Sequence, residues 1–191
     1  WRKLKKNRMA VAGLVIIVCL FAVAICADII ADWDDVVVKQ NIPERLQKPS
    51  KEHWFGTDEY GRDIFARIIH GTRVSIQVGF ISITISLILG GILGSIAGFF
   101  GDKIDNLIMR LMDIFLAMPN ILLAIAIVSA LGSSIPNLMI ALGIANTPKF
   151  TRVVRAAVIT VKDQEYIEAA RAIGARNHTI IMHHILNNCM A

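Results

Sequence analysis

The chain has 191 residues, of which 55% are hydrophobic and 18% are charged, and its formal net charge is +5. Several uncharged runs approach or exceed the length of a membrane-spanning helix, which excludes a soluble globular protein. The basic excess is a topology signal, so nucleic acid is not needed to explain it. We therefore predict an all-α, polytopic membrane protein, a bundle of transmembrane helices.

The amino-terminal region, residues 1–31, combines a basic tail with a first span at about 9–31. No charge occurs from Met9 to Ala27, and the run lacks the features of a cleavable signal. Basic residues without any acid precede it, which predicts a cytoplasmic amino terminus: Arg2, Lys3, Lys5, Lys6 and Arg8. Cys19 and Cys26 are too far apart on one helix to bridge, and Cys189 lies on the reducing side, so no disulfide is expected.

Residues 32–73 form the predicted extracytoplasmic loop. Its second half reads as turns followed by a short amphipathic helix, with Ile64, Phe65, Ile68 and Ile69 on one side. Such a helix would lie on the membrane before the next span begins, with an Asp63–Arg67 pair at i,i+4.

The second span, at about 74–100, carries a stripe of small residues at spacings of three and four: Ser75, Gly79, Ser82, Ser86, Gly90, Gly94 and Gly98. Gly90, Gly94 and Gly98 form a doubled GxxxG, which lets another helix approach closely. The partner could belong to a static core or to a moving bundle. Gln77 and Thr84 form a separate polar line, and they could face a pathway or a neighbouring helix.

Two further spans are expected at about 104–131 and 136–160, joined by the tight connection 131–136. Pro119 removes a backbone hydrogen bond inside the third span, which predicts a kink or break. An Arg110–Asp113 pair is expected at the start of this span. The nearby methionines read as core residues.

The final segment, 161–191, follows a basic stripe of Lys149, Arg152 and Arg155 that we expect to meet anionic headgroups. Its excess of basic residues predicts a cytoplasmic location. A short helix is expected to start at Glu168, and Gly174 can adopt the left-handed conformation that ends it.

The stretch Glu168-Ala169-Ala170-x-x-x-Gly174 resembles the EAA signature of ABC importer permeases. The outer motif His-Trp-Phe-Gly-Thr-Asp-Glu-x-Gly-Arg-Asp, residues 53–63, resembles the dipeptide, oligopeptide and nickel permease subfamily, in its second-permease (C-type) branch. The similarity continues beyond the signature, but Asn187 stands where that family has a proline.

This resemblance implies that Glu168, Ala169, Ala170 and Gly174 dock a separate ATPase. It also implies a six-span subunit, of which this chain would be a fragment that stops before two further spans. The expected partners are a second permease, two ATPase subunits or domains, an extracytoplasmic binding protein and the lipid bilayer of a prokaryotic inner membrane. In such permeases the region of Pro119 borders the translocation pathway, so Pro119 could contribute to a gate.

No catalytic motif is visible, since the sequence lacks a phosphate-binding loop and a nucleophile–base pair. ATP and Mg²⁺ are therefore expected on the partner ATPases, with no cofactor in this chain. His178, His183 and His184 do not suggest a metal site, because adjacent residues point apart on a helix. We expect an importer subunit that translocates peptides, nickel or a related small solute. The alternative is a non-transporting scaffold or sensor with an accidental EAA match.

Overall fold

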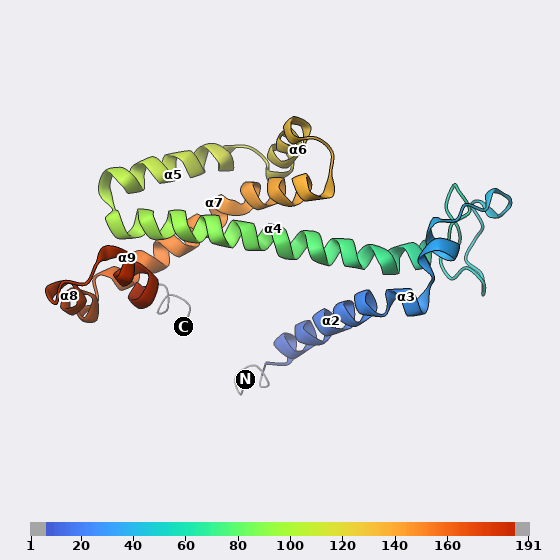
Figure 1. Cartoon of the computed structure of the whole chain (residues 1–191), viewed down its shortest axis with the longest axis horizontal. Helices are drawn as coiled ribbons and strands as arrows, with labels where there is room; N and C mark the ends of the chain where they lie inside the picture. The colour runs from blue at the N-terminus through green and yellow to red at the C-terminus, as the bar shows by residue number, and fades with distance from the viewer. Residues whose placement is uncertain (1–6, 186–191) are drawn as a thin grey trace. The chain divides into compact units, whose positions relative to one another are not determined.

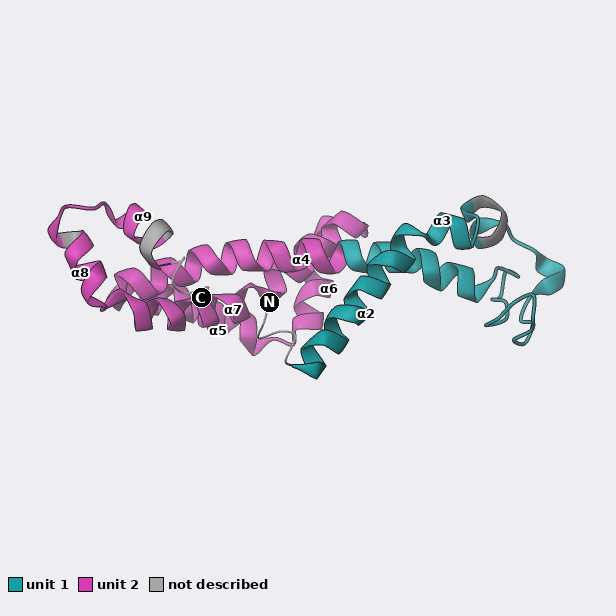
Figure 2. Ribbon diagram, turned by 90° about the horizontal axis from the view of Figure 1, so that it is seen from below, with its two compact units in different colours: residues 1–77 teal, residues 78–191 magenta. Residues whose placement is uncertain are grey.

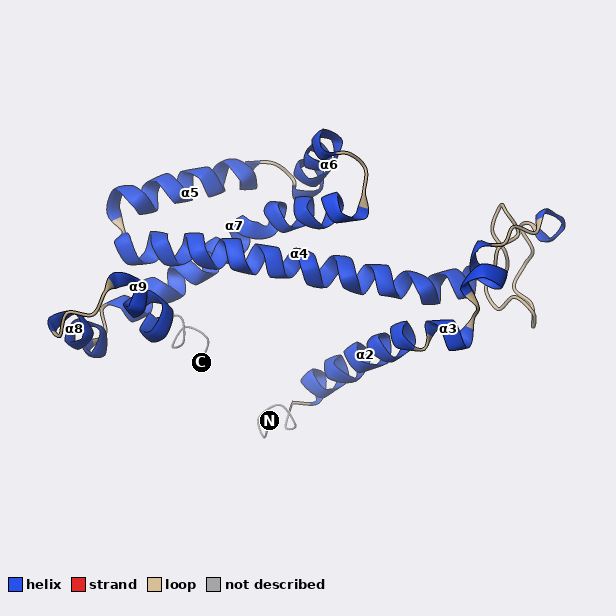
Figure 3. Ribbon diagram, in the orientation of Figure 1, coloured by secondary structure: helices blue, strands red, loops and turns tan. Residues whose placement is uncertain are grey.

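The computed structural model describes residues 7–185, apart from the side chains at 34–36, 171, 178 and 182–184. The described residues form helices joined by short loops, with no strand, which confirms the all-α fold (Figures 1 and 3). The helices follow in the order α2 (Arg8–Ile25), α3 (Ala27–Ile30), α4 (Ile64–Phe100), α5 (Asp102–Ala117), α6 (Asn120–Leu131), α7 (Ile135–Lys162), α8 (Glu165–Ala172) and α9 (Asn177–Thr179). Shorter helical turns are η1 (Trp33–Val38), η2 (Ile42–Glu44) and η3 (Ile180–Ile185).

Two described helices, α2 and α4, are long and apolar enough to cross a membrane. The pair α5 and α6 reaches this standard together, but the two are bent by 93° at the break around Pro119. The predicted break is thus confirmed, since proline cannot donate the backbone hydrogen bond that a continuous helix needs. Helix α7 covers the fourth predicted span but carries basic residues, so the count of four spans stays a prediction.

The chain divides into two compact units, residues 1–77 and 78–191 (Figure 2). In the first unit, Asn7 caps α2 by accepting the backbone N–H groups of Met9 and Ala10. The guanidinium of Arg73 on α4 binds the carbonyls of Ala24 and Ile25, at 2.6 and 3.3 Å, where α2 ends. Those carbonyls lack helical partners and carry partial negative charge, so this cation stabilises the helix end.

Arg73 also donates to both carboxylate oxygens of Asp28, at 3.0 and 2.8 Å. Buried His70, one turn earlier on α4, binds the carbonyl of Ala31 at 2.8 Å and packs on Trp33. The start of α4 is therefore fastened to α2 and α3 by polar contacts.

The predicted short membrane-surface helix that begins near Ile64 is not a separate element, because α4 runs without a break from Ile64 to Phe100. Asp63 caps this helix by accepting the backbone N–H of Ala66 at 2.8 Å. The predicted Asp63–Arg67 pair is also wrong, since Arg67 pairs with Asp58 and Asp63 with His53. Tertiary partners displaced the local i,i+4 contact.

The motif at residues 53–63 builds a turn structure around Asp58. Its carboxylate accepts the backbone N–H groups of Tyr60 and Arg62 and also the Arg62 side chain. Partial burial raises the pKa of Asp58, but the hydrogen bonds from Arg62 and the backbone outweigh it and lower the pKa to about 2.

Both glycines of this motif are required by close backbone approaches. Gly56 and Gly61 have φ of 75° and 72°. A Cβ at Gly56 would lie 2.3 Å from the carbonyl oxygen of Gln47, and one at Gly61 would lie 1.7 Å from that of Asn41. The motif that resembles the permease subfamily is therefore a structural one in this chain.

In the second unit, α6 and α7 are joined by the short connection at residues 132–134 and pack against each other. Ser134 caps α7 by accepting the backbone N–H of Asn137 at 3.2 Å. Leu123 and Ala124 of α6 are buried with Ala141 and Ala145 of α7. The tight connection predicted from 131–136 is thus present.

Candidate coupling segment and membrane core

The glycine stripe of α4 packs against α7. A Cβ at Gly94 would lie 2.6 Å from the carbonyl oxygen of Thr151 and 2.9 Å from Cβ of Val154. Gly90 and Gly98 are equally close to α7. Contacts this short leave no room for a side chain, so the two backbones touch along the stripe.

The same seam continues toward the start of α7 through hydroxyl groups. Ser82 donates to the carbonyl of Met139 at 3.0 Å, and Ser86 donates to that of Gly143 at 2.7 Å. Each partner on α7 lies 57 positions after its serine, and the glycine contacts keep nearly the same offset, so α4 and α7 run parallel with one register. The contact with α7 does not extend to Gly79, nearer the start of α4, because a Cβ at that position would meet nothing within 4 Å.

Two ion pairs join α5 to α7. Arg155 forms two hydrogen bonds with the carboxylate of Asp105, both at 2.5 Å, and Arg152 binds Asp113 at 2.5 Å. The expected Arg110–Asp113 pair is therefore wrong, because Asp113 finds its partner on another helix. Arg152 and Arg155 both engage acidic side chains of α5. Contact of the stripe Lys149, Arg152 and Arg155 with headgroups stays a prediction.

The segment with the EAA pattern is the helix α8, which begins at Glu165, three residues before the predicted start at Glu168. Ile167 and Ala170 are buried in a cluster with Val158 of α7 and Phe99 of α4. Ile180 and Ile185 of η3 complete this cluster. Helix α8 is therefore anchored on the end of α7.

The opposite side of α8 is exposed. Glu168, Ala169 and Ala172 lie on this side at spacings of three and four, together with Glu165. Ile173 follows with 86% of its surface exposed. A helix fixed on one side and open on the other can receive a partner on its open side.

Gly174 ends this segment as predicted, with φ of 84° and an exposed backbone. The N–H of Ala175 bonds back to the carbonyl of Ala170 at 3.0 Å, the contact of a Schellman cap. A side chain at Gly174 would meet no atom within 4 Å, so only the left-handed backbone favours glycine.

The residues predicted for a pathway or gate are not brought together. Gln77 is exposed, and Thr84 donates its hydroxyl to the carbonyl of Phe80 on its own helix at 2.8 Å. Pro119 is exposed at the α5–α6 break. Their proposed roles remain predictions.

Within the described residues no group of three metal-binding side chains occurs. The side chains of His178, His183 and His184 lie outside the described part, as do Asn187 and Cys189.

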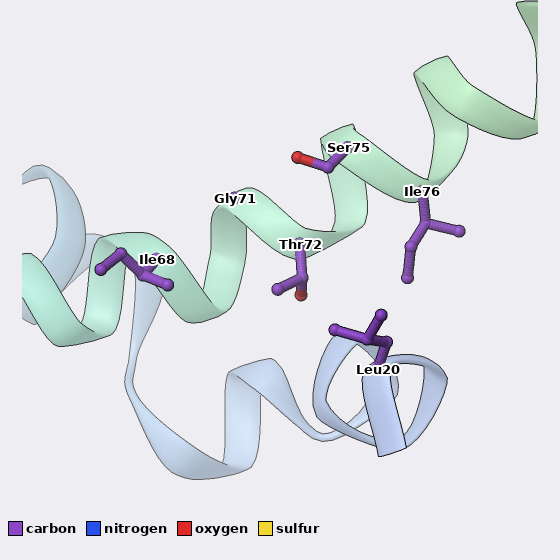
Figure 4. A pocket seen from close by; sticks show the side chains of 6 residues that line it. All are labelled: Leu20, Ile68, Gly71, Thr72, Ser75 and Ile76. Carbon is purple, nitrogen blue, oxygen red and sulfur yellow. The ribbon is translucent and has the colours of Figure 1, made fainter. Parts of the chain in front are cut away.

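An open groove of about 610 Å³ lies in the first unit, between α2 and the start of α4 (Figure 4). Its lining is formed by Leu20, Ile68, Gly71, Thr72, Ser75 and Ile76. No charged side chain and none of the predicted site residues belongs to this lining, so it does not join the sites described above.

Sequence reasoning missed one polar contact inside the second unit. The side-chain amide of Asn120, at the start of α6, donates to the amide oxygen of Asn146 on α7 at 3.4 Å. The amide nitrogen of Asn146 donates to the carbonyl of Leu142 at 3.0 Å. The signal was available, because both asparagines are polar residues within the otherwise mostly apolar, uncharged run from Ile114 to Pro148.

Comparison with known proteins gives two family matches. Residues 90–191 match the family described as "Binding-protein-dependent transport system inner membrane component". Residues 1–49 match the "N-terminal TM domain of oligopeptide transport permease C".

Among the similar curated proteins is a dipeptide transport system permease protein of Alkalihalophilus pseudofirmus, 51% identical over 191 residues, which are 100% of this chain and 62% of that protein. A dipeptide transport system permease protein of Bacillus subtilis is 36% identical over 190 residues, covering 100% and 59%. A glutathione transport system permease protein of Pectobacterium atrosepticum is 39% identical over 189 residues, covering 97% and 62%. The chain thus spans about three fifths of these relatives' length, and similarity along all of it rules out an accidental EAA match.

Proposed function

Because the chain belongs to the family of binding-protein-dependent transport system inner membrane components, we propose that it is the permease subunit of an ATP-driven importer of small peptides. The observation that carries the proposal is the arrangement of α8. Its apolar side is buried against Val158 of α7, while Glu168 and Ala169 face outward. This arrangement supports a docking element that is anchored on a membrane helix.

Partner ATPase subunits would bind ATP and Mg²⁺ and hold the exposed side of α8. When the ATPases close, α8 would move as a lever, and the buried cluster around Ile167 would transmit that movement to α7. Helix α4 would follow, because its glycine stripe touches α7 through backbone. A second permease would complete the pathway, and alternating openings would carry the substrate inward.

The proposed substrate class is supported by the relatives, whose names specify dipeptides and glutathione. We propose a small peptide, delivered by an extracytoplasmic binding protein. The basic residues of the amino terminus support a cytoplasmic location for it, and α8 would then share the compartment in which ATP is available.

The test is transport in reconstituted vesicles. The chain should be co-expressed with the neighbouring genes for its ATPases, second permease and binding protein, purified and placed in vesicles that contain ATP. Uptake of a labelled dipeptide that depends on both ATP and the binding protein supports the proposal. An assembled complex that hydrolyses ATP but accumulates no peptide from a broad panel contradicts the assigned substrate class.

A further inference from the structure

We propose that Asn120, Asn146 and Lys149 form a polar contact site on the inner part of the translocation pathway. There they contact the amide and carboxylate groups of the peptide during transport. This inference rests on the proposed transport function. It starts from the depth of the asparagine pair, which the contacts between α4 and α7 establish.

Asn146 lies between two residues of α7 whose contacts with α4 are known. Ser86 donates to the carbonyl of Gly143, and a Cβ at Gly90 would lie 3.0 Å from the carbonyl oxygen of Thr147. Asn146 is therefore at the level of Ser86 to Gly90. This level lies deep within the uncharged stretch 74–101, about 18 Å along the helix from its cytoplasmic end at a rise of about 1.5 Å per residue.

Polar side chains at this depth are costly in lipid and usually face protein or water. Asn120 and Asn146 are only half-buried, so the amides are not fully enclosed by the described part of the chain. Their mutual contact, at 3.4 Å, is near the upper limit for a hydrogen bond. Both amides can therefore exchange this contact for a ligand at low cost.

Lys149 adds a second observation. It follows Asn146 by three residues, so both lie on one side of α7, and it is exposed. Lys149 lies near the middle of α7, and an ammonium group there has a high free-energy cost if it faces hydrocarbon. The same group is easily accommodated if that side of α7 borders water.

The chemistry of the three side chains fits a peptide. A carboxamide donates and accepts hydrogen bonds, as a peptide group does, and an ammonium attracts a terminal carboxylate. The helical hydrogen bonding of the backbone is also incomplete beside both asparagines. The α5–α6 break directly precedes Asn120, and Pro148, two residues after Asn146, removes a backbone donor from α7. Irregular backbone at membrane depth is tolerated where it lines a cavity.

The experiment is thiol accessibility in inverted membrane vesicles that hold the whole complex. In a background of Cys19→Ala, Cys26→Ala and Cys189→Ala, single cysteines replace Asn146 or Lys149, and the control replaces Ile140. Ile140 is an exposed apolar residue. At about 3.6 residues per turn it lies on the side of α7 opposite Lys149 and about a third of a turn away from Asn146. A membrane-impermeant, positively charged thiosulfonate is then added from the cytoplasmic side.

A thiol reacts as its thiolate, which forms in water and not in lipid. The proposal predicts that both test cysteines react about tenfold or more faster than the control, and that saturating dipeptide slows them at least about threefold. Rates as slow as at Ile140 would show that the asparagines only pack helices together, and would overturn the inference. A fast reaction that dipeptide never slows, in a complex that imports it, would overturn peptide contact. If the wild-type complex imports no peptide, the proposed function fails, whereas the accessibility pattern still reports whether this side of α7 borders water.

Discussion

The contact between α4 and α7 gives a sharp prediction at Gly94. Replacing it with leucine forces a Cβ to within 2.6 Å of the Thr151 carbonyl oxygen and 3.0 Å of the Arg155 backbone nitrogen. Since ordinary contacts begin at about 3.4 Å, the helices must separate by roughly 0.5–1 Å for the first carbon alone. The remaining side chain adds to the overcrowding, which costs about 1–3 kcal/mol.

Separation would also stretch the hydroxyl contacts of Ser82 and Ser86 along the same seam, each worth about 0.5–1.5 kcal/mol. We expect the melting temperature of the purified protein to fall by about 2–10 °C. The matched control is Gly91→Leu, three residues away on the same helix, where a Cβ would meet no atom within 4 Å. Equal melting temperatures for Gly94→Leu and Gly91→Leu, measured in one detergent, would refute the packing account.

Three further predictions concern other parts of the chain. A cysteine at Lys51 should react with an impermeant thiol reagent on intact cells, whereas one at Arg176 should not; the opposite pattern would reverse the proposed orientation. Asp105→Arg and Arg155→Asp should each weaken thermal stability, and the double variant should recover most of the loss; no recovery would mean that the ion pair contributes nothing. Because the pKa of Asp58 is lowered from 3.8 to about 2, its contribution to the stability of the turn structure at residues 53–63 is complete above about pH 4 and is lost as the pH falls through 2. Tryptophan fluorescence should change in that window and change less in Asp58→Asn, and a transition centred above pH 5 would contradict this.

The helices themselves could be predicted from composition, because uncharged runs and glycine spacing are local properties of the sequence. Pro119 marked the break, since proline removes a backbone donor wherever it occurs in a helix. The small-residue stripe indicated close packing, but its partner α7 and the parallel register depend on contacts between residues more than 50 positions apart. No local rule provides them.

The errors share one cause, which is that local pairing rules overlook tertiary partners. Arg67 and Asp113 each have an oppositely charged neighbour at helical spacing, yet both bind a residue on another segment. The surface helix predicted at the start of α4 is wrong for a similar reason. Its charged residues suggested a surface helix, whereas Arg73 binds the carbonyl end of α2 and Asp28.

In the candidate sites, too, local features could be predicted from the sequence, whereas features that depend on tertiary contacts could not. The left-handed conformation of Gly174 could be predicted, because a glycine that follows an alanine-rich helix is a common cap. The side of α8 that is exposed could not, since it depends on burial of Ile167 against α7. The Asn120–Asn146 contact joins helices whose relative placement the sequence does not specify.

The central claim is that the exposed side of α8 docks an ATPase, and retention of that ATPase on the purified chain tests it most directly. Glu168 is exposed beside small residues, so a basic residue of the ATPase is its natural partner, and Glu168→Lys would replace attraction by repulsion. Loss of such a pair costs about 2–5 kcal/mol, or roughly thirtyfold or more in affinity. With Glu59→Lys, at an exposed position of the 53–63 motif, as the charge-matched control, we predict that Glu168→Lys reaches the membrane normally but purifies without the ATPase, while the control keeps it. Wild-type retention of the ATPase by Glu168→Lys would contradict the claim that this side of α8 is the docking surface.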